Sequence, residues 1–252
     1  MAYLYPTNAP RVLAHRGLAL AANGDLLDEN TIPAFRRAVE AGATHIESDI
    51  QVTADGVPVL FHDNTLLRVA GIDRAINQID MAEVKQIKLM HGGTIPTLES
   101  ALQEVPHALF NLDFKSEEAP KAGAAVILEQ KAQERILVAS FSESRRSAAA
   151  MLLPESATSA SGEMAALARL TSMFGHFGLK QAVSGVQALQ LPTRSGPFRF
   201  DSARFISALA DLGVETHFWT INDPAEMKRL VALGAAGIVT DRADLAVWAL
   251  GL

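Results

Sequence analysis

The stretch that decides the fold is His45-Ile46-Glu47-Ser48-Asp49-Ile50-Gln51-Val52, in which apolar and polar side chains alternate with the period of a β-strand. The isoleucines and the valine fall on one face of this expected strand, whereas Glu47 and Asp49 fall on the other. A strand in an open antiparallel sheet shows the same alternation, with its polar face in water. In a closed barrel, helices cover the outer face and the polar row points into the lumen, where it is costly unless it is paired or binds a ligand.

A second stretch, Leu109-Phe110-Asn111-Leu112-Asp113-Phe114-Lys115, has the same alternation and places Asp113 and Lys115 on its polar face. Two expected strands therefore present carboxylates on one face. This recurrence favours a barrel whose lumen carries a polar site.

Segments typical of strands and of helices alternate along almost the whole chain. Helix starts are indicated at Thr31-Ile32-Pro33 and Asn222-Asp223-Pro224. We expect strands at 11–15, 45–52, 57–61, 108–114, 136–141, 156–160, 182–189, 214–220 and 236–239, and helices near 31–41, 97–104, 118–132, 142–152, 163–173, 201–212, 223–233 and 242–250.

Eight strand–helix units with right-handed crossovers predict an α/β fold of the (β/α)8 TIM-barrel type, with 57–61 as an extra strand. The main alternative is an open doubly wound sheet, but no Gly-x-Gly-x-x-Gly follows the first strand. Because the chain shows no linker or repeat, we expect residues 1–252 to form one domain. Residues 64–96 are interpreted as a small insertion over the C-terminal mouth, with one short helix at 81–89, and 192–197 as a second loop.

The net charge of −6 argues against a nucleic-acid or anionic-membrane binder. The absence of cysteine rules out disulfides and a thiolate nucleophile, and it favours a reducing compartment. Residues 1–10 lack a basic stretch followed by an apolar one, and no apolar run approaches the roughly 20 residues that span a bilayer. We therefore expect a cytoplasmic protein with no signal peptide and no stable membrane insertion.

Two histidines, His15 and His62, stand at the ends of expected strands beside Arg16 and Asp63. Histidine changes charge near neutral pH, so such a pair suits general acid and base catalysis. A lone strand histidine is more often structural, but the paired setting favours catalysis. Arg16 offers a planar fork that matches a phosphate, and Asp63 either orients His62 or closes a turn.

The carboxylates Glu47, Asp49 and Asp113 form a set of three hard oxygen ligands, which favours Mg²⁺ or Ca²⁺ over zinc. The alternative is that Glu47 and Asp49 pair with Arg16 and Lys115, and the two interpretations are compatible in a phosphate site. With a divalent cation and neutral histidines, these five side chains leave a small positive charge, which suits a phosphodiester. The sequence thus predicts a metal-assisted phosphodiesterase.

The same residues form motifs that resemble those of the glycerophosphodiester phosphodiesterase family. The resemblance spans residues 11 to about 241, and its motifs keep their order along the chain. They are His15-Arg16-Gly17, Glu29-Asn30-Thr31 with Phe35 and Ala38, Gly42-Ala43, Ile46-Glu47, Asp49-Ile50, Thr53, Asp55-Gly56, Pro58-Val59, Phe61-His62-Asp63, Ile95-Pro96-Thr97-Leu98-Glu99, Asn111-Leu112-Asp113-Phe114-Lys115, Ser140-Phe141, Trp219-Thr220-Ile221-Asn222 and Gly237-Ile238-Val239-Thr240-Asp241.

The resemblance implies a barrel with its site at the C-terminal mouth, one divalent cation (Mg²⁺ or Ca²⁺, with Mn²⁺ as a third choice), and hydrolysis of a small glycerophosphodiester to sn-glycerol 3-phosphate and an alcohol. By motif position it implies Glu47, Asp49 and Asp113 as metal ligands, His15 and His62 as the acid/base pair, Arg16 and Lys115 on the phosphate, Trp219 in the substrate pocket, and Glu29, Asn30 and Asp63 as supporting residues. A homodimer is a further expectation, and the alcohol group is left open.

Two departures from the family pattern matter. Many members have glutamate where Asp113 stands, and aspartate there resembles related phospholipase D toxins, so lysophospholipid cleavage is the alternative activity. The segment Leu18–Asp28 has no evident family pattern. Among other functions, a carboxylate-pair glycosidase would give the two histidines no role. A non-catalytic binding module would be expected to lack a histidine or a ligand, and none is missing.

Overall fold

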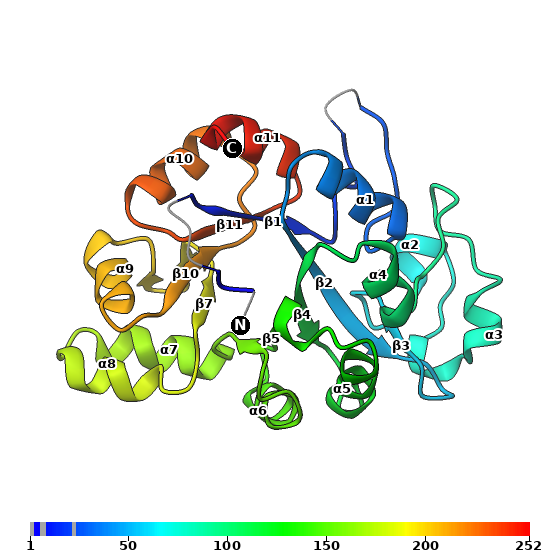
Figure 1. Cartoon of the computed structure of the whole chain (residues 1–252), viewed down its shortest axis with the longest axis horizontal. Helices are drawn as coiled ribbons and strands as arrows, with labels where there is room; N and C mark the ends of the chain where they lie inside the picture. The colour runs from blue at the N-terminus through cyan, green and yellow to red at the C-terminus, as the bar shows by residue number, and fades with distance from the viewer. Residues whose placement is uncertain (1–2, 6–8, 22–23) are drawn as a thin grey trace.

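The computed structural model describes residues 3–5, 9–21 and 24–252. The description leaves out residues 1–2, 6–8 and 22–23. The first two ranges belong to the stretch 1–10 in which no signal peptide is expected, and the third belongs to Leu18–Asp28. The main sheet consists of parallel strands in the order β6-β5-β4-β2-β1-β11-β10-β7 (Figure 1). These strands are β1 (Arg11–His15), β2 (His45–Val52), β4 (Leu109–Phe114), β5 (Ile136–Ala139), β6 (Ala157–Thr158), β7 (Ala188–Leu191), β10 (Glu215–Phe218) and β11 (Gly237–Thr240).

The two ends of this strand order, β6 and β7, meet and bring the sheet to a nearly closed barrel. Ser159 forms a parallel bridge with Ala188. The backbone N–H of Gln187 donates to the carbonyl of Thr158, and that of Ala160 donates to the carbonyl of Ala188, both at 2.9 Å. The predicted TIM barrel is confirmed, and the open doubly wound sheet is wrong.

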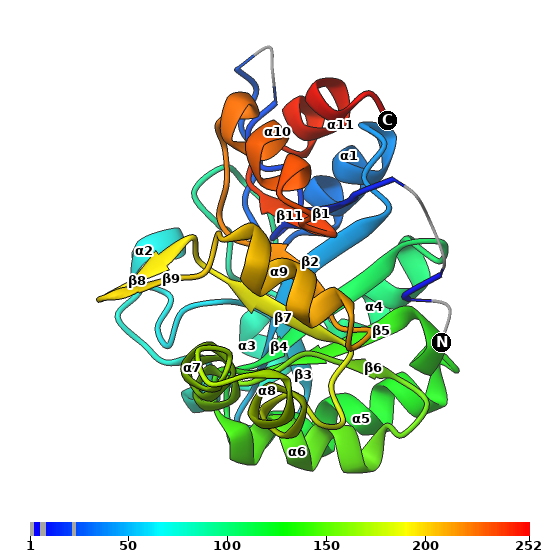
Figure 2. The same ribbon diagram turned by 90° about the vertical axis from the view of Figure 1, so that its left-hand side faces the viewer.

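Helices surround the barrel, as Figures 1 and 2 show. Thr31 caps the first of them by accepting from the backbone N–H of Ala34, and Asp223 caps a later one, so both predicted helix starts are confirmed. Ile46 and Ile50 are buried in the layer between strands and helices, as their alternation predicts. The helices are α1 (Ile32–Glu40), α4 (Leu98–Glu104), α5 (Ala119–Glu129), α6 (Glu143–Leu152), α7 (Gly162–Thr171), α8 (His176–Ala182), α9 (Ala203–Ala210), α10 (Pro224–Ala232) and α11 (Ala243–Leu250), with a 3-10 turn, η2 (Gln133–Arg135), before β5.

The N-terminal end of the barrel lumen is filled by side chains. Tyr3 is fully buried there in a cluster with Leu109 and Leu137. His45 and His217 are also fully buried, and Nε2 of His217 lies 3.0 Å from a carboxylate oxygen of Glu215. Among the described residues, buried side chains therefore close the lumen at this end, and its cavity lies toward the carboxyl ends of the strands.

The insertion between β2 and α4 has a small core of its own. β3 (Pro58–Leu60) pairs antiparallel with β2, which confirms the extra strand. Three short helices follow, α2 (Leu67–Ala70), the 3-10 turn η1 (Ile76–Gln78) and α3 (Met81–Val84), so the single helix predicted at 81–89 is too long and two others were missed. Their core is formed by Val59, Phe61, Leu66, Val69, Ile76, Ile79, Val84, Leu89 and Ile95.

The region before β7 corrects one further prediction. Residues 182–189 were expected to form a strand, but helix α8 continues to Ala182 and β7 begins only at Ala188. Leu179, Ala182, Val183 and Val186 are buried at helical spacing against the large core, and Gly185 turns the chain with φ of 78°. The loop predicted at 192–197 includes β8 (Arg194–Ser195), which forms a short hairpin with β9 (Phe198–Arg199) just beyond it.

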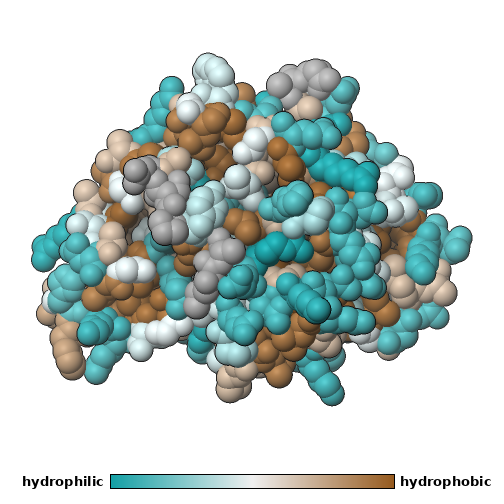
Figure 3. All heavy atoms as spheres, in the orientation of Figure 1, coloured by the Kyte–Doolittle hydropathy of each residue, from teal (hydrophilic) through white to brown (hydrophobic). Residues whose placement is uncertain are grey.

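None of the described helices is long and apolar enough to cross a membrane. Figure 3 shows that hydrophilic and hydrophobic residues are interspersed on the face viewed in Figure 1.

Candidate active site

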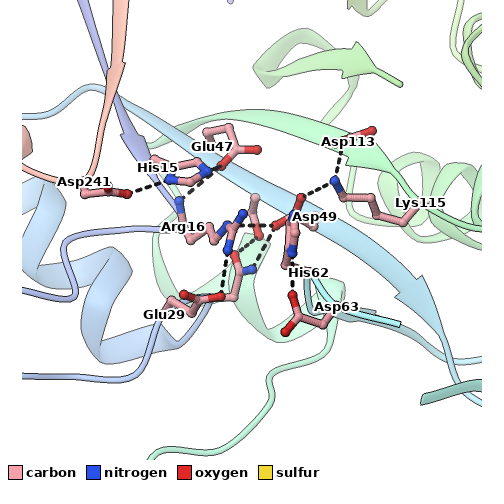
Figure 4. Close-up of polar contacts among 12 residues, drawn as sticks. His15, Arg16, Glu29, Glu47, Asp49, His62, Asp63, Asp113, Lys115 and Asp241 are labelled. Carbon is pink, nitrogen blue, oxygen red and sulfur yellow. Dashed lines mark hydrogen bonds and ion pairs between the residues drawn. The ribbon is translucent and has the colours of Figure 1, made fainter. Parts of the chain in front are cut away.

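A cavity of about 260 Å³ opens at the carboxyl ends of the barrel strands. Eight of the predicted site residues line it: His15, Arg16, Glu47, Asp49, His62, Asp113, Lys115 and Trp219. Its other lining residues are Asn111, Ala139, Ser140, Phe141, Ala160, Ser161, Gly162, Ala165, Gln190, Thr220 and Val239. The three remaining predicted residues, Glu29, Asn30 and Asp63, lie behind this lining in contact with it. The structure therefore brings the whole predicted set together. Figure 4 shows the charged residues and histidines of this set.

His15 is the last residue of β1, and its Nδ1 lies 2.6 Å from Oδ1 of Asp241, just after β11. Asn222 holds Asp241 in turn, because its Nδ2 donates to Oδ2 at 2.7 Å and its Oδ1 accepts the backbone N–H of Asp241 at 2.9 Å. Burial opposes the charged form of His15, but the hydrogen bond to Asp241 and the charge of Glu47 outweigh it and raise the pKa of His15. His15 thus has a fixed ring orientation, and its carboxylate neighbours stabilise its protonated form.

His62 has a matching arrangement. Its Nδ1 lies 2.6 Å from Oδ1 of Asp63, the next residue in the chain. A carboxylate beside Nδ1 assigns the proton of the neutral ring to that nitrogen and leaves Nε2 to accept or give a proton. Nδ1 of each of these two histidines therefore lies against an aspartate (Figure 4). The contact places Asp63 where the first of its two predicted roles, to orient His62, requires it.

Arg16 occupies a turn whose backbone is held from several sides. Its φ of 56° lies in the left-handed region, which non-glycine residues adopt rarely and mostly at functional sites. The backbone N–H of Arg16 donates to the carbonyl of Glu47 at 2.9 Å, and its own carbonyl accepts from Asn30 at 2.9 Å. Gly17 follows with φ of 84°, and a Cβ there would lie 2.8 Å from the carbonyl carbon of Ala34. The turn therefore requires this glycine.

The side chain of Arg16 is directed by two carboxylates. Its Nη1 donates to Oε1 of Glu29 at 2.9 Å, and its Nε lies 3.6 Å from Oδ2 of Asp49. That Nε is buried and has no hydrogen-bond partner among the described residues. A buried, unpartnered donor of a guanidinium beside the cavity is suited to an anionic oxygen.

Asp49 and Asp113 are paired in register on neighbouring strands, β2 and β4. Lys115 bridges them, with Nζ 3.1 Å from Oδ1 of Asp49 and 2.7 Å from Oδ2 of Asp113. Asn30, which was predicted as a supporting residue, donates from its side chain to the second oxygen of Asp49 at 3.0 Å. The alternative interpretation, in which the carboxylates pair with Arg16 and Lys115, therefore holds for Asp49 in this structure.

The carboxylates differ in charge state. Burial, aided by the charge of Asp49, raises the pKa of Glu47 to about 7. Burial also raises the pKa of Asp113, although the ammonium of Lys115 opposes it. Burial acts in the same sense on Asp49, but Lys115 and Arg16 outweigh it and hold the pKa of that carboxyl below its usual value. Burial thus opposes the charged forms of Glu47 and Asp113, whereas Asp49 is stabilised as a carboxylate by its two cationic neighbours.

The donor set fits a hard divalent cation in its chemistry. Three carboxylates line one cavity, and the raised pKa of Glu47 and Asp113 reflects a cost that a bound cation would relieve. In the conformation described, however, Lys115 lies between Asp49 and Asp113, and no group of three His, Cys, Asp or Glu side chains in the described ranges is spaced to hold an ion. The predicted ligand set therefore stays a prediction that requires Lys115 to move.

The far wall of the cavity is apolar. Phe141 and Trp219 meet edge to face with ring centroids 5.9 Å apart, and Phe141 is 61 % exposed. Gly162 and Ala165 of α7 extend this wall. The cavity thus combines a charged side, suited to a phosphate, with an apolar side, suited to the rest of a substrate.

Three residues that contact the site were not predicted from the sequence as site residues. Asp241 and Asn222 belong to motifs that carry the family resemblance, but nothing local assigned them to His15, from which Asp241 is 226 positions away. The third is Arg68 on α2, which donates to both Asp63 and Glu29. A basic residue shortly after the His62-Asp63 pair was the only available signal.

The fold and the residues at its mouth define a (β/α)8-barrel enzyme of the phosphodiesterase class. The chain belongs to the glycerophosphoryl diester phosphodiesterase family, whose family model matches residues 15–245. It is 34% identical over 235 residues to the "probable glycerophosphodiester phosphodiesterase 2" of Mycobacterium tuberculosis, covering 92% of this chain and 88% of that protein. It is 27% identical to a glycerophosphodiester phosphodiesterase of Caldanaerobacter subterraneus, covering 91% and 93% of the two chains.

Solved structures share the fold over nearly the full length. A phosphodiesterase of Oleispira antarctica, solved in complex with its product sn-glycerol-3-phosphate, has a TM-score of 0.80 at 24% identity and covers 100% of this chain and 99% of its own. A glycerophosphodiester phosphodiesterase structure from Thermotoga maritima has a TM-score of 0.74 at 25% identity, with 96% and 99% coverage.

Proposed function

We propose that the protein hydrolyses small glycerophosphodiesters to sn-glycerol 3-phosphate and an alcohol, with His15 and His62 as acid and base. The observation that carries this proposal is the pair of aspartate-held imidazoles on one cavity, each with Nδ1 2.6 Å from a carboxylate oxygen. Family membership and the product bound to the Oleispira enzyme support the choice of substrate. The cytoplasmic location and the homodimer stay predictions.

Phosphate binding is assigned to Arg16 and Lys115, which border the cavity from opposite sides of Asp49. Their cationic groups would pair with the non-bridging oxygens and hold the phosphorus between the two imidazoles. Glu47, Asp49 and Asp113 would hold one divalent cation, Mg²⁺ or Ca²⁺ with Mn²⁺ as a third choice. When bound, that cation would neutralise charge on the phosphate oxygens.

Proton transfer would use Nε2 of each histidine. One imidazole removes the proton of the attacking hydroxyl as the new P–O bond forms. The P–O bond to the alcohol breaks, and the other imidazole gives its Nε2 proton to the departing oxygen. Asp63 and Asp241 keep the two rings oriented.

The attacking hydroxyl is expected to be the 2-hydroxyl of the glycerol, because an internal nucleophile has an effective concentration that water cannot match. The first product is then a 1,2-cyclic phosphate, which water opens to sn-glycerol 3-phosphate with the histidines in exchanged roles. Phosphorus NMR during turnover tests this route. Solvent oxygen in the phosphate with inversion at phosphorus, and no cyclic species, would count against it.

Hydrolysis of glycerophosphocholine and glycerophosphoethanolamine, with and without EDTA, tests the overall proposal. We expect EDTA, His15→Ala and His62→Ala each to abolish activity, and the exposed His107→Ala to leave it unchanged. Activity that survives both EDTA and His15→Ala would reject it.

Lysophospholipids are a second candidate substrate. The apolar wall of Phe141 and Trp219 beside the charged half of the cavity favours them, because it could accept part of a hydrocarbon chain. A comparison of rates on lysophosphatidylcholine and glycerophosphocholine decides between the two classes.

A further inference from the structure

The guanidinium of Arg68 binds two carboxylates at once. Its Nε and Nη2 donate to the two oxygens of Asp63 at 2.6 and 3.1 Å. Its Nη1 and Nη2 donate to the two oxygens of Glu29 at 3.1 and 2.5 Å. Each carboxylate is thus held in the two-point geometry that only arginine provides.

Each of these carboxylates also holds a residue of the proposed mechanism. Asp63 accepts from Nδ1 of His62 at 2.6 Å, and Glu29 accepts from Nη1 of Arg16 at 2.9 Å. A continuous chain of hydrogen bonds therefore runs from a candidate acid/base group, through Arg68, to a candidate phosphate ligand. This chain of hydrogen bonds joins the turn after β1 to the turn after β3, two parts of the site that lie far apart in the sequence.

The backbone of Arg68 is held in place by its neighbours. It lies on α2 next to Val69 and two residues after Leu66, both of which are buried in the insertion core. Its own side chain is 50% exposed and is absent from the lining of the cavity. Arg68 therefore acts on the substrate only through Asp63 and Glu29.

Removal of the guanidinium would leave two carboxylates near one another with Arg16 and His62 as their partners. Asp63 could then rotate away from Nδ1 of His62, and Glu29 would draw Arg16 more strongly from the cavity. The first change lowers the rate of proton transfer and the second weakens phosphate binding.

We propose that Arg68 is a positioning residue, through which the insertion orients His62 and Arg16 together. The proposal rests on the proposed function for its kinetic consequence, but the hydrogen-bond chain itself is independent of the reaction catalysed.

The test compares Arg68→Met and Arg68→Lys with a matched control, Arg74→Met. Arg74 is on the same insertion, is similarly exposed, and forms an ion pair with Glu83 away from the cavity. On glycerophosphocholine we expect Arg68→Met to lower kcat and to raise KM, with a combined loss of about 10- to 100-fold. Arg68→Lys should recover only part of the loss, because one ammonium cannot engage four carboxylate oxygens. Added guanidinium should partly restore Arg68→Met.

Two measurements do not depend on turnover. The low-field Nδ1 proton resonance of His62, assigned by its loss in His62→Gln, should disappear or move in Arg68→Met and remain in Arg74→Met. The Kd for sn-glycerol 3-phosphate should rise in Arg68→Met alone.

If Arg68→Met is folded and keeps the His62 resonance, the product affinity and kcat/KM within about twofold, the positioning role is wrong. If the wild-type protein has no activity on any glycerophosphodiester, the proposed function fails. The resonance and the product affinity then still decide the role of Arg68.

Discussion

Nδ1 of His15 lies 2.6 Å from Oδ1 of Asp241; His15 ends the first strand of the barrel, and Asp241 directly follows the last one. The contact is possible because β1 and β11 pair in parallel, with Ala14 opposite Thr240. Asp241 is therefore a positioning residue of the same kind as Asp63, but it comes to its histidine through the fold and not through the local sequence.

Asp241→Asn tests this positioning. The amide has the size of the carboxylate but can present its NH2 to Nδ1, so the imidazole loses its charged partner and its favoured tautomer. We expect kcat on glycerophosphocholine to fall by about 100-fold, with little change in KM. Asp244→Asn is the control, because Asp244 pairs with Arg242 in the same region without lining the cavity. Equal activities of the two variants would contradict the assignment.

Lys115→Met separates the two roles of the carboxylate cluster. The substitution removes a phosphate ligand, so we expect activity to fall by about 100-fold or more. It also removes the ammonium between Asp49 and Asp113, so Mn²⁺ affinity, followed by its EPR signal, should be retained or increased. Loss of Mn²⁺ binding in folded Lys115→Met would argue against Asp49 and Asp113 as metal ligands.

Gly17→Ala should destabilise the turn that carries Arg16. The positive φ costs about 1–2 kcal/mol for alanine, and the 2.8 Å approach to Ala34 adds about 1–3 kcal/mol of overpacking. Gly56→Ala has nearly the same φ, 85°, with no atom within 4 Å of the new Cβ, so it reports the φ cost alone. Urea unfolding of both variants measures the difference, and equal losses would show that the turn yields to the methyl group.

His45 should make stability fall in acid. Burial lowers the pKa of His45 to about 3, so the native ring stays neutral where the unfolded chain binds a proton. Its contribution is complete above the unfolded pKa of roughly 6.5 and is lost as the pH falls toward 3, at up to about 1.4 kcal/mol per pH unit. His45→Gln should show a shallower decline in urea unfolding between pH 7 and 4.5. Parallel curves for the two proteins would contradict this.

The alternation in His45–Val52 predicted which side chains of β2 face the helices and which face the lumen. The local sequence is sufficient for this, because successive side chains of a strand point to opposite faces. The strand expected at 182–189 was wrong because Val183, Val186 and Leu189 look β-like in isolation. In the structure α8 ends at Ala182 and the chain turns at Gly185, so of these three residues only Leu189 lies in a strand. The contact partner of a site residue is harder to predict from the sequence than the face of a strand. Arg68 and Glu29 are 39 positions apart, and their contact depends on how the insertion docks.

The pairing of β1 with β11 has a consequence for the protein during its synthesis. Asp241 is added to the growing chain 226 residues after His15. A nascent chain that stops before β11 would possess nearly every group of the site and still lack the one that orients His15. The onset of turnover on a growing chain would therefore report the moment at which the ring of strands is completed.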